Sequence, residues 1–148
     1  MKIIASFTAL VAATAAIATL ALTTMAQADL KPGQDAATFL RCNGATAHIK
    51  DENSYDKALT LCKTSIVYYA AAESQAVEED DKCRALMYEG ATFLSTAYIF
   101  RYSTKKDPYF QAKGTEFMSY VIDNCNNEPE MQKTAASVLK LELSDLDG

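Results

Sequence analysis

The chain has 148 residues and a formal net charge of −5, with 49% hydrophobic and 22% charged residues, which is the balance of a globular protein. The negative charge and the absence of a Lys/Arg run argue against a nucleic-acid-binding protein and against a binder of anionic membranes. Five Gly and three Pro argue against an all-β sandwich with many tight turns.

Residues 1–28 have the pattern of a cleavable export signal. Lys2 provides the positive start, Ile3–Met25 is an apolar run and Ala26–Ala28 matches an A-x-A cleavage site. A single membrane anchor is the alternative, but small residues and Thr dilute the run. We therefore expect residues 29–148 to form one helical domain without a membrane span, located in a bacterial periplasm in preference to a eukaryotic secretory route.

Five amphipathic helices are predicted, because apolar residues recur every three or four positions between polar turns. The predicted helices are Asp35–Lys50, Tyr55–Ala76, Lys82–Tyr102, a helix from Pro108 to a break at Asn124–Glu128, and Pro129–Leu143. The predicted turns are Asp51–Ser54, Val77–Asp81 and Ser103–Asp107, and the acidic tail Ser144–Gly148 is expected to fray. The third helix has the widest apolar face and is predicted to be central. The fold class is therefore an all-α bundle of antiparallel hairpins.

Four cysteines in an exported chain indicate two disulfides. Cys42, Cys62, Cys83 and Cys125 form no C-x-x-C pair and no short-spaced zinc set. Three pairings are possible, and facing residues of an antiparallel hairpin lie equally far from its turn. Cys42 and Cys62 average to position 52, in the first turn, and Cys83 and Cys125 average to 104, in the third. The preferred pairing is therefore Cys42–Cys62 with Cys83–Cys125.

A faint internal repeat suggests two related hairpins. Gly44-Ala45-Thr46 recurs as Gly90-Ala91-Thr92, and Tyr55-x-x-Ala58 recurs as Tyr109-x-x-Ala112. The second piece is similar to a helix of a tetratricopeptide repeat, although the 34-residue period is missing. The repeat motivates an alternative function, a structural or chaperone-like interaction module of the envelope.

No catalytic or metal-binding set is recognisable in the sequence. His48 is the only imidazole, it lies near a predicted helix end, and no G-x-S-x-G, H-E-x-x-H or S-x-x-K motif occurs. We expect a protein without cofactor that is not an enzyme, and an enzyme of unrecognised type stays the third hypothesis.

Two surfaces are candidates for binding a protein partner. The predicted contact is the acidic run, which attracts a basic partner, and the alternative is a merely solvated face. Tyr102 and Tyr109 are the second candidate, whereas the other tyrosines can serve to fill a core that lacks Trp. In an up-down bundle the acidic run shares an end with Asn124–Glu128. The tyrosine pair lies at the other end with Lys105, Lys106 and His48–Glu52. The acidic run consists of Glu78, Glu79, Asp80 and Asp81.

Three sequence pieces resemble the exported amidase-immunity proteins of type VI secretion, the Rap/Tai group. They are Phe39-Leu40-x-Cys42; Cys62 followed by Ile66-Val67-Tyr68 with Cys83 further on; and Phe117–Val121 with Glu128-Pro129-Glu130 and Ala135-Ala136-x-Val138-Leu139. The resemblance implies a small, helical, disulfide-bonded immunity protein that inhibits a toxic cell-wall hydrolase. The implied target is a cysteine amidase, blocked by an inserted turn or helix end.

Overall fold

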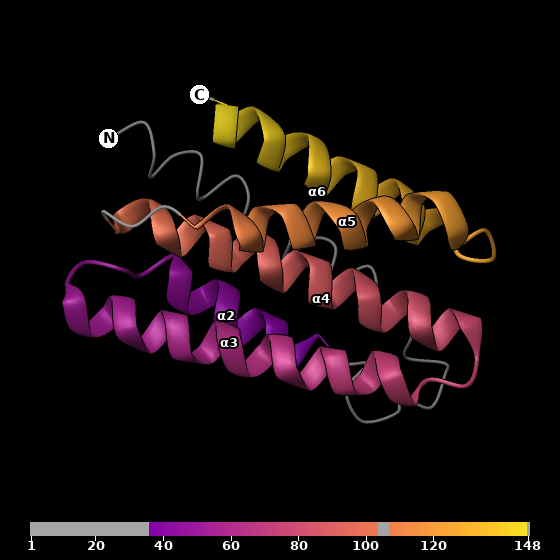
Figure 1. The fold of residues 1–148 in the computed structure, drawn as a ribbon, viewed down its shortest axis with the longest axis horizontal. Helices are drawn as coiled ribbons and strands as arrows, with labels where there is room; N and C mark the ends of the chain where they lie inside the picture. Colours follow the sequence, from indigo (N-terminus) through magenta and orange to yellow (C-terminus); the bar gives the residue numbers. More distant parts are fainter. Residues whose placement is uncertain (1–35, 104–106, 148) are drawn as a thin grey trace.

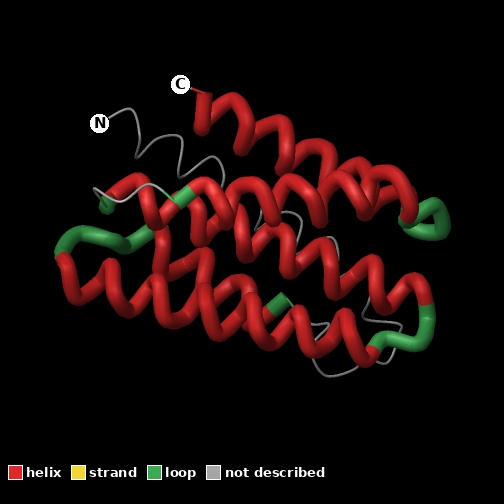
Figure 2. Tube along the Cα trace, viewed as in Figure 1, coloured by secondary structure: helices red, strands yellow, loops and turns green. Residues whose placement is uncertain are grey.

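The protein is described by a computed structural model over residues 36–103 and 107–147, with residues 141–147 described by their backbone alone. The predicted export signal lies outside these residues. Five α-helices and one 3-10 turn make up the described part, which contains no strand, so the predicted all-α bundle is confirmed (Figures 1 and 2). The elements are α2 (Ala37–Thr46), α3 (Glu52–Gln75), α4 (Glu79–Ile99), η1 (Phe100–Tyr102), α5 (Pro108–Asn124) and α6 (Pro129–Asp147).

The start of α3 corrects the predicted turn Asp51–Ser54. Asp51 is the N-cap of α3, and its Oδ1 accepts a hydrogen bond from the Ser54 backbone N–H at 2.8 Å. The Ser54 hydroxyl in turn accepts from the Asp51 N–H at 3.0 Å. This reciprocal capping box satisfies two backbone donors, so the helix begins at Glu52 instead of after the turn.

The start of α4 corrects the second predicted turn, Val77–Asp81. Glu78 is the N-cap, and Glu79–Asp81 form the first helical turn. Negative side chains are favoured there because the helix dipole places partial positive charge at the N-terminus. The acidic run therefore forms the N-terminal end of α4 and is not a turn between two helices.

Two other predicted boundaries also differ from the structure. Helix α2 ends at Thr46, not at Lys50. The Ala47 N–H still donates to the Asn43 carbonyl four residues back, but the His48 N–H donates to the Ala45 carbonyl only three residues back, which closes the helix with a tighter turn. The predicted cap Asp35 lies outside the described residues. Helix α6 runs to Asp147 and not only to the predicted end at Leu143, since no Gly or Pro interrupts the sequence before Gly148.

Helix α4 runs through the middle of the bundle, between the α2–α3 pair and the α5–α6 pair (Figure 1). Every α4 residue from Cys83 to Ile99 is buried, which confirms that the third predicted helix is central. The connections α3–α4 and α5–α6 lie at one end of the bundle, and α2–α3 and η1 lie at the other (Figure 2). The two candidate surfaces are therefore at opposite ends, as the topology predicts.

Tyrosines fill much of the core. Tyr69 on α3 and Tyr88 on α4 are fully buried, and their ring centroids are 5.4 Å apart. The Tyr69 hydroxyl accepts a hydrogen bond from the Phe39 backbone N–H of α2 at 3.0 Å. The ring thus joins three helices while its polar end stays satisfied, which is the core-filling role expected where Trp is absent.

Two glycines allow α4 and α5 to approach closely. A Cβ on Gly114 would lie 2.6 Å from Leu94 Cγ, and a Cβ on Gly90 would lie 3.2 Å from Phe117 Cβ. Gly44, the repeat partner of Gly90, has open space around its Cα. The glycines of the faint internal repeat therefore serve different structural roles.

Both predicted disulfides are present. Cys42–Cys62 joins α2 to α3, and Cys83–Cys125 joins α4 to the C-terminal end of α5. Each bond closes one hairpin, as the equal distances from the turns predict. No cysteine is left free, which is typical of a protein from an oxidising compartment outside the cytoplasm. Among the described helices, none combines the length and apolarity that a bilayer crossing demands.

Candidate functional site

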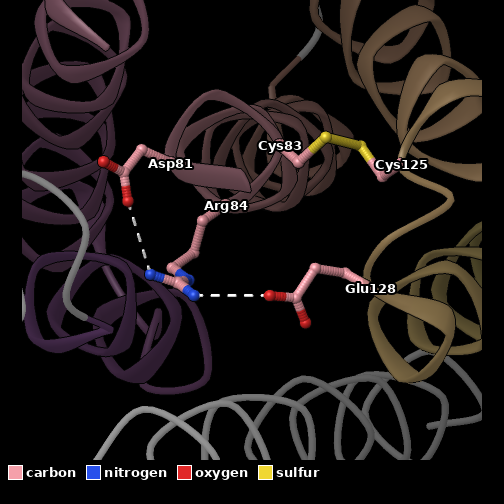
Figure 3. A network of polar contacts seen from close by, with 5 residues as sticks. All are labelled: Asp81, Cys83, Arg84, Cys125 and Glu128. Carbon is pink, nitrogen blue, oxygen red and sulfur yellow. Dashed lines mark hydrogen bonds and ion pairs between the residues drawn. A yellow bond between two sulfur atoms is a disulfide. The ribbon is translucent and has the colours of Figure 1, made fainter. Parts of the chain in front are cut away.

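The first candidate surface, the acidic end, consists of Glu78–Asp81 together with Glu128. Arg84 lies between two of its carboxylates, with Nη1 3.6 Å from Asp81 Oδ1 and Nη2 3.5 Å from Glu128 Oε1 (Figure 3). Arg84 belongs to α4 and Glu128 to the connection before α6, so the ion pairs tie the α5–α6 turn to the start of α4. The disulfide Cys83–Cys125 joins the same two regions (Figure 3).

A further carboxylate of the acidic end has a partner within the fold. The Tyr120 hydroxyl of α5 donates a hydrogen bond to Glu79 Oε1 at 3.2 Å. Lys82 Nζ lies 5.5 Å from the centroid of the same tyrosine ring. Together with the helix dipole, these contacts give much of the acidic run a structural role. Its predicted role in binding a partner stays a prediction.

The opposite end carries a hollow of about 610 Å³, which we call the tyrosine hollow. The α2–α3 connection, the first turns of α3 and the end of η1 form its walls, so segments about 50 residues apart meet there. Tyr102 is 44% exposed in this place. The lining residues are Ile49, Lys50, Asp51, Glu52, Tyr55, Asp56, Tyr102 and Ser103.

The hollow lies on a buried cluster that contains a disulfide. Ile49 and Tyr55 pack against a buried cluster that contains the Cys42–Cys62 disulfide together with Ala58 and Ile99. The wall of the hollow therefore rests on a covalent crosslink and on the end of the central helix. Such backing reduces the conformational entropy that a partner must remove on binding.

The carboxylates of the hollow differ in their partners. Hydrogen bonds from Ser54, first the backbone N–H and then the hydroxyl, lower the pKa of Asp51, which is thereby committed to capping α3. Glu52 and Asp56 are exposed and lie one helical turn apart. Within the part of the chain that the structure describes, neither makes an ion pair or a side-chain hydrogen bond. Lys50 is the cation among the lining residues.

Tyr109 does not line the hollow with Tyr102. Its ring lies on the α4–α5 face, 6.0 Å from the Phe93 ring and 5.4 Å from the Phe110 ring. It is 53% exposed, so it belongs to a separate aromatic surface. The structure thus divides the predicted tyrosine pair between two places.

His48 has the environment of a helix-end residue. Its Nδ1 lies 2.7 Å from the Gly44 carbonyl oxygen at the C-terminal end of α2, and the side chain is exposed. Neither a carboxylate nor a hydroxyl side chain contacts the imidazole through a hydrogen bond that the described residues supply. Across those same residues, no three His, Cys, Asp or Glu side chains converge as metal ligands.

One buried titratable residue is not marked by any sequence motif. Glu89 lies in the middle of α4 and is only 5% exposed. Burial raises the pKa of its carboxyl to about 7, and the negative charge of Glu73 adds to the increase while Lys113 opposes it. The sequence signal for its burial is that Glu89 is the single carboxylate in the most apolar predicted helix, Lys82–Tyr102.

No family model matches the chain, and comparisons with curated proteins and with solved structures return no match either. The function must therefore be argued from the residues and the geometry of the two ends.

Proposed function

We propose that the protein is a periplasmic, non-enzymatic binding protein that acts as an immunity protein against a toxic cell-wall amidase of type VI secretion. The observation that carries the proposal is the rigid hollow at the α2–α3 end, which rests on the Cys42–Cys62 disulfide. A preformed concave surface with exposed tyrosine suits protein recognition.

Three further features support this function. The two disulfides suit an exported protein, and the export-signal pattern at residues 1–28 suits the periplasm. His48 contacts a backbone carbonyl, and no carboxylate or hydroxyl of the described residues forms a hydrogen bond with it, as a general base would require. The resemblance to the Rap/Tai group supplies the target class, a peptidoglycan amidase whose site is blocked by an inserted turn or helix end. The element proposed for this insertion is the capped α2–α3 turn, which lines the hollow.

Co-expression tests the proposal. Cells that carry a periplasmically targeted amidase toxin encoded beside this gene should survive when the protein is co-expressed. A matched variant without its export signal should give no protection, because it stays in the other compartment. Growth arrest despite periplasmic expression of the folded protein contradicts the proposal.

A pull-down from envelope extract separates this function from the chaperone-like alternative. One stoichiometric hydrolase on the bait supports an immunity protein. Many unfolded clients would support the tetratricopeptide-like module, whose sequence basis is weakened by the unequal surroundings of Gly44 and Gly90. Ala58 is buried whereas its repeat partner Ala112 is exposed, which weakens it further.

A further inference from the structure

We propose that the tyrosine hollow binds an arginine side chain of the protein partner. This inference deepens the proposed function, on which it rests for the existence of a protein partner. The ligand class follows from three properties of the hollow: its volume, its aromatic walls and its charge.

The hollow has room for an arginine side chain and is lined by two tyrosines. Its volume of about 610 Å³ falls within the range of small-ligand sites. Tyr55 and Tyr102 line it from two separate elements, α3 and η1. Guanidinium groups stack on aromatic faces and lose less hydration than ammonium groups when they do so. The aromatic lining therefore favours arginine over lysine.

The charge of the hollow favours a cation. Among the described residues, its lining holds three carboxylates and one lysine, and Asp51 is occupied by Ser54. Glu52 and Asp56 occupy neighbouring turns of one helix face, where like charges repel. A guanidinium in the hollow would relieve this repulsion and donate hydrogen bonds to both carboxylates.

At the acidic end, an arginine of the chain itself pairs with two carboxylates. There, one arginine, Arg84, lies between the carboxylates of Asp81 and Glu128 and is mostly buried (Figure 3). The hollow presents two carboxylates beside aromatic rings, but no arginine is among its lining residues. The partner supplies the missing guanidinium, and a basic partner is the class that the net charge of −5 also attracts.

An NMR titration of the mature protein tests the inference without the partner. The probe is N-acetyl-L-arginine methylamide, and the control probe is the citrulline analogue, which has nearly the same shape but no charge. We expect saturable amide shifts in residues 49–56 and 102–103, with a dissociation constant on the order of millimolar, as suits a ligand of this size. The citrulline probe should bind at least about tenfold more weakly, because each 1.4 kcal/mol lost is tenfold in affinity.

Variants locate the binding. The double substitution Glu52→Gln/Asp56→Asn should weaken arginine binding about tenfold or more, and Tyr102→Leu should weaken it with the charges intact. The matched control Glu78→Gln/Asp80→Asn removes two carboxylates at the acidic end and should leave the titration unchanged. Circular dichroism verifies that each variant is folded.

Three results would overturn the inference: equal binding of both probes, shifts centred elsewhere, or unchanged binding in the folded Glu52→Gln/Asp56→Asn variant. None of them bears on co-expression protection, which tests the proposed function alone. Conversely, arginine binding in the hollow without any protection from the toxin contradicts the proposed function and leaves the ligand assignment standing.

Discussion

The two ends of the bundle both gather carboxylates, yet they differ in what faces those carboxylates. At the acidic end, Arg84 lies between Asp81 and Glu128, and Tyr120 donates to Glu79. At the tyrosine hollow, Glu52 and Asp56 are lining residues together with two tyrosines, and neither makes an ion pair or a side-chain hydrogen bond among the described residues. The three acidic-end carboxylates with side-chain partners in the fold are poorer candidates for a protein contact than Glu52 and Asp56, which have no such partner among the described residues.

The largest expected effects come from the two disulfides, one for each hairpin. Replacing Cys83 and Cys125 by Ser should lower the free energy of unfolding by about 4 kcal/mol, and replacing Cys42 and Cys62 by about 3 kcal/mol, because the first pair closes the longer loop. Urea unfolding of both double variants measures the difference. Only the Cys42/Cys62 variant should also lose arginine binding, since that disulfide backs the hollow. Equal loss of arginine binding in both variants would contradict the prediction that only the Cys42–Cys62 disulfide supports the hollow.

The buried Glu89 lies on α4 between the two ends of the bundle, and we expect it to make the free energy of unfolding depend on pH. Its pKa is about 7 in the folded protein against an ordinary 4.5, so the folded state binds more protons between these values. The contribution of Glu89 to stability is therefore fully present below pH 4.5 and is lost as the pH rises to about 7. Glu89→Gln should raise the free energy of unfolding at pH 8 by roughly 1–3 kcal/mol and flatten the profile between pH 5 and 8.

Unfolding at pH 5, 6.5 and 8 measures the Glu89 effect. Glu73→Gln is the matched control, because it removes the neighbouring charge and leaves the buried carboxyl in place. Its effect should have the same direction and be smaller. A wild-type profile that rises from pH 5 to 7, with Glu89→Gln showing the same rise, would falsify the assignment.

The substitution Arg84→Met measures how much the ion pairs of the acidic end contribute to the free energy of unfolding. Asp81 and Glu128 lose their shared cation at a site where the arginine side chain is only 11% exposed. We expect a loss of about 1–2 kcal/mol, between the cost of an exposed pair and that of a fully buried one. Thermal or urea unfolding at pH 7 measures it. A loss below about 0.5 kcal/mol would mean that the acidic end is not held together by this arginine.

The smallest expected effect is at the hollow. Asp56→Asn removes one member of a like-charged pair on α3, so the free energy of unfolding should stay constant or rise by up to about 0.5 kcal/mol. The same unfolding assay checks it beside Arg84→Met. If Asp56→Asn is as destabilising as Arg84→Met, the hollow carboxylates serve the fold, and the contrast between the ends fails.

The sequence predicts the architecture and the disulfide pairing well, because a helix advances by a constant rise per residue and each cysteine pair is equidistant from its turn. It predicts helix starts less well. The reciprocal bonds of Asp51 and Ser54, and the dipole that favours Glu79–Asp81, make helix starts from residues that are also typical of turns. The central position of α4 is predicted by its wide apolar stripe, but its burial on every side is a result of packing.

The hollow could not be predicted because it depends on tertiary structure. Helix α2 ends at Thr46, which leaves Ala47–Lys50 as a non-helical connection, and packing brings Tyr102 beside it. Topology alone places Tyr102 and the 48–52 segment at the same end. Nothing in the sequence marks Tyr55 and Asp56 as binding residues, because a tyrosine and an aspartate near a helix start are ordinary residues. Burial of Glu89 likewise depends on neighbours from α3 and α5.

The affinity for the protein partner, measured in paired charge variants, decides between the two ends. The proposed contact surface is the tyrosine hollow and not the acidic end. Glu52→Gln/Asp56→Asn and Glu78→Gln/Asp80→Asn remove the same charge from opposite ends, and the dissociation constant of each for the co-purified hydrolase is compared with the wild type. The account predicts at least a tenfold loss for the hollow variant, about 1.4 kcal/mol, and an unchanged value for the other. A loss confined to Glu78→Gln/Asp80→Asn would contradict it.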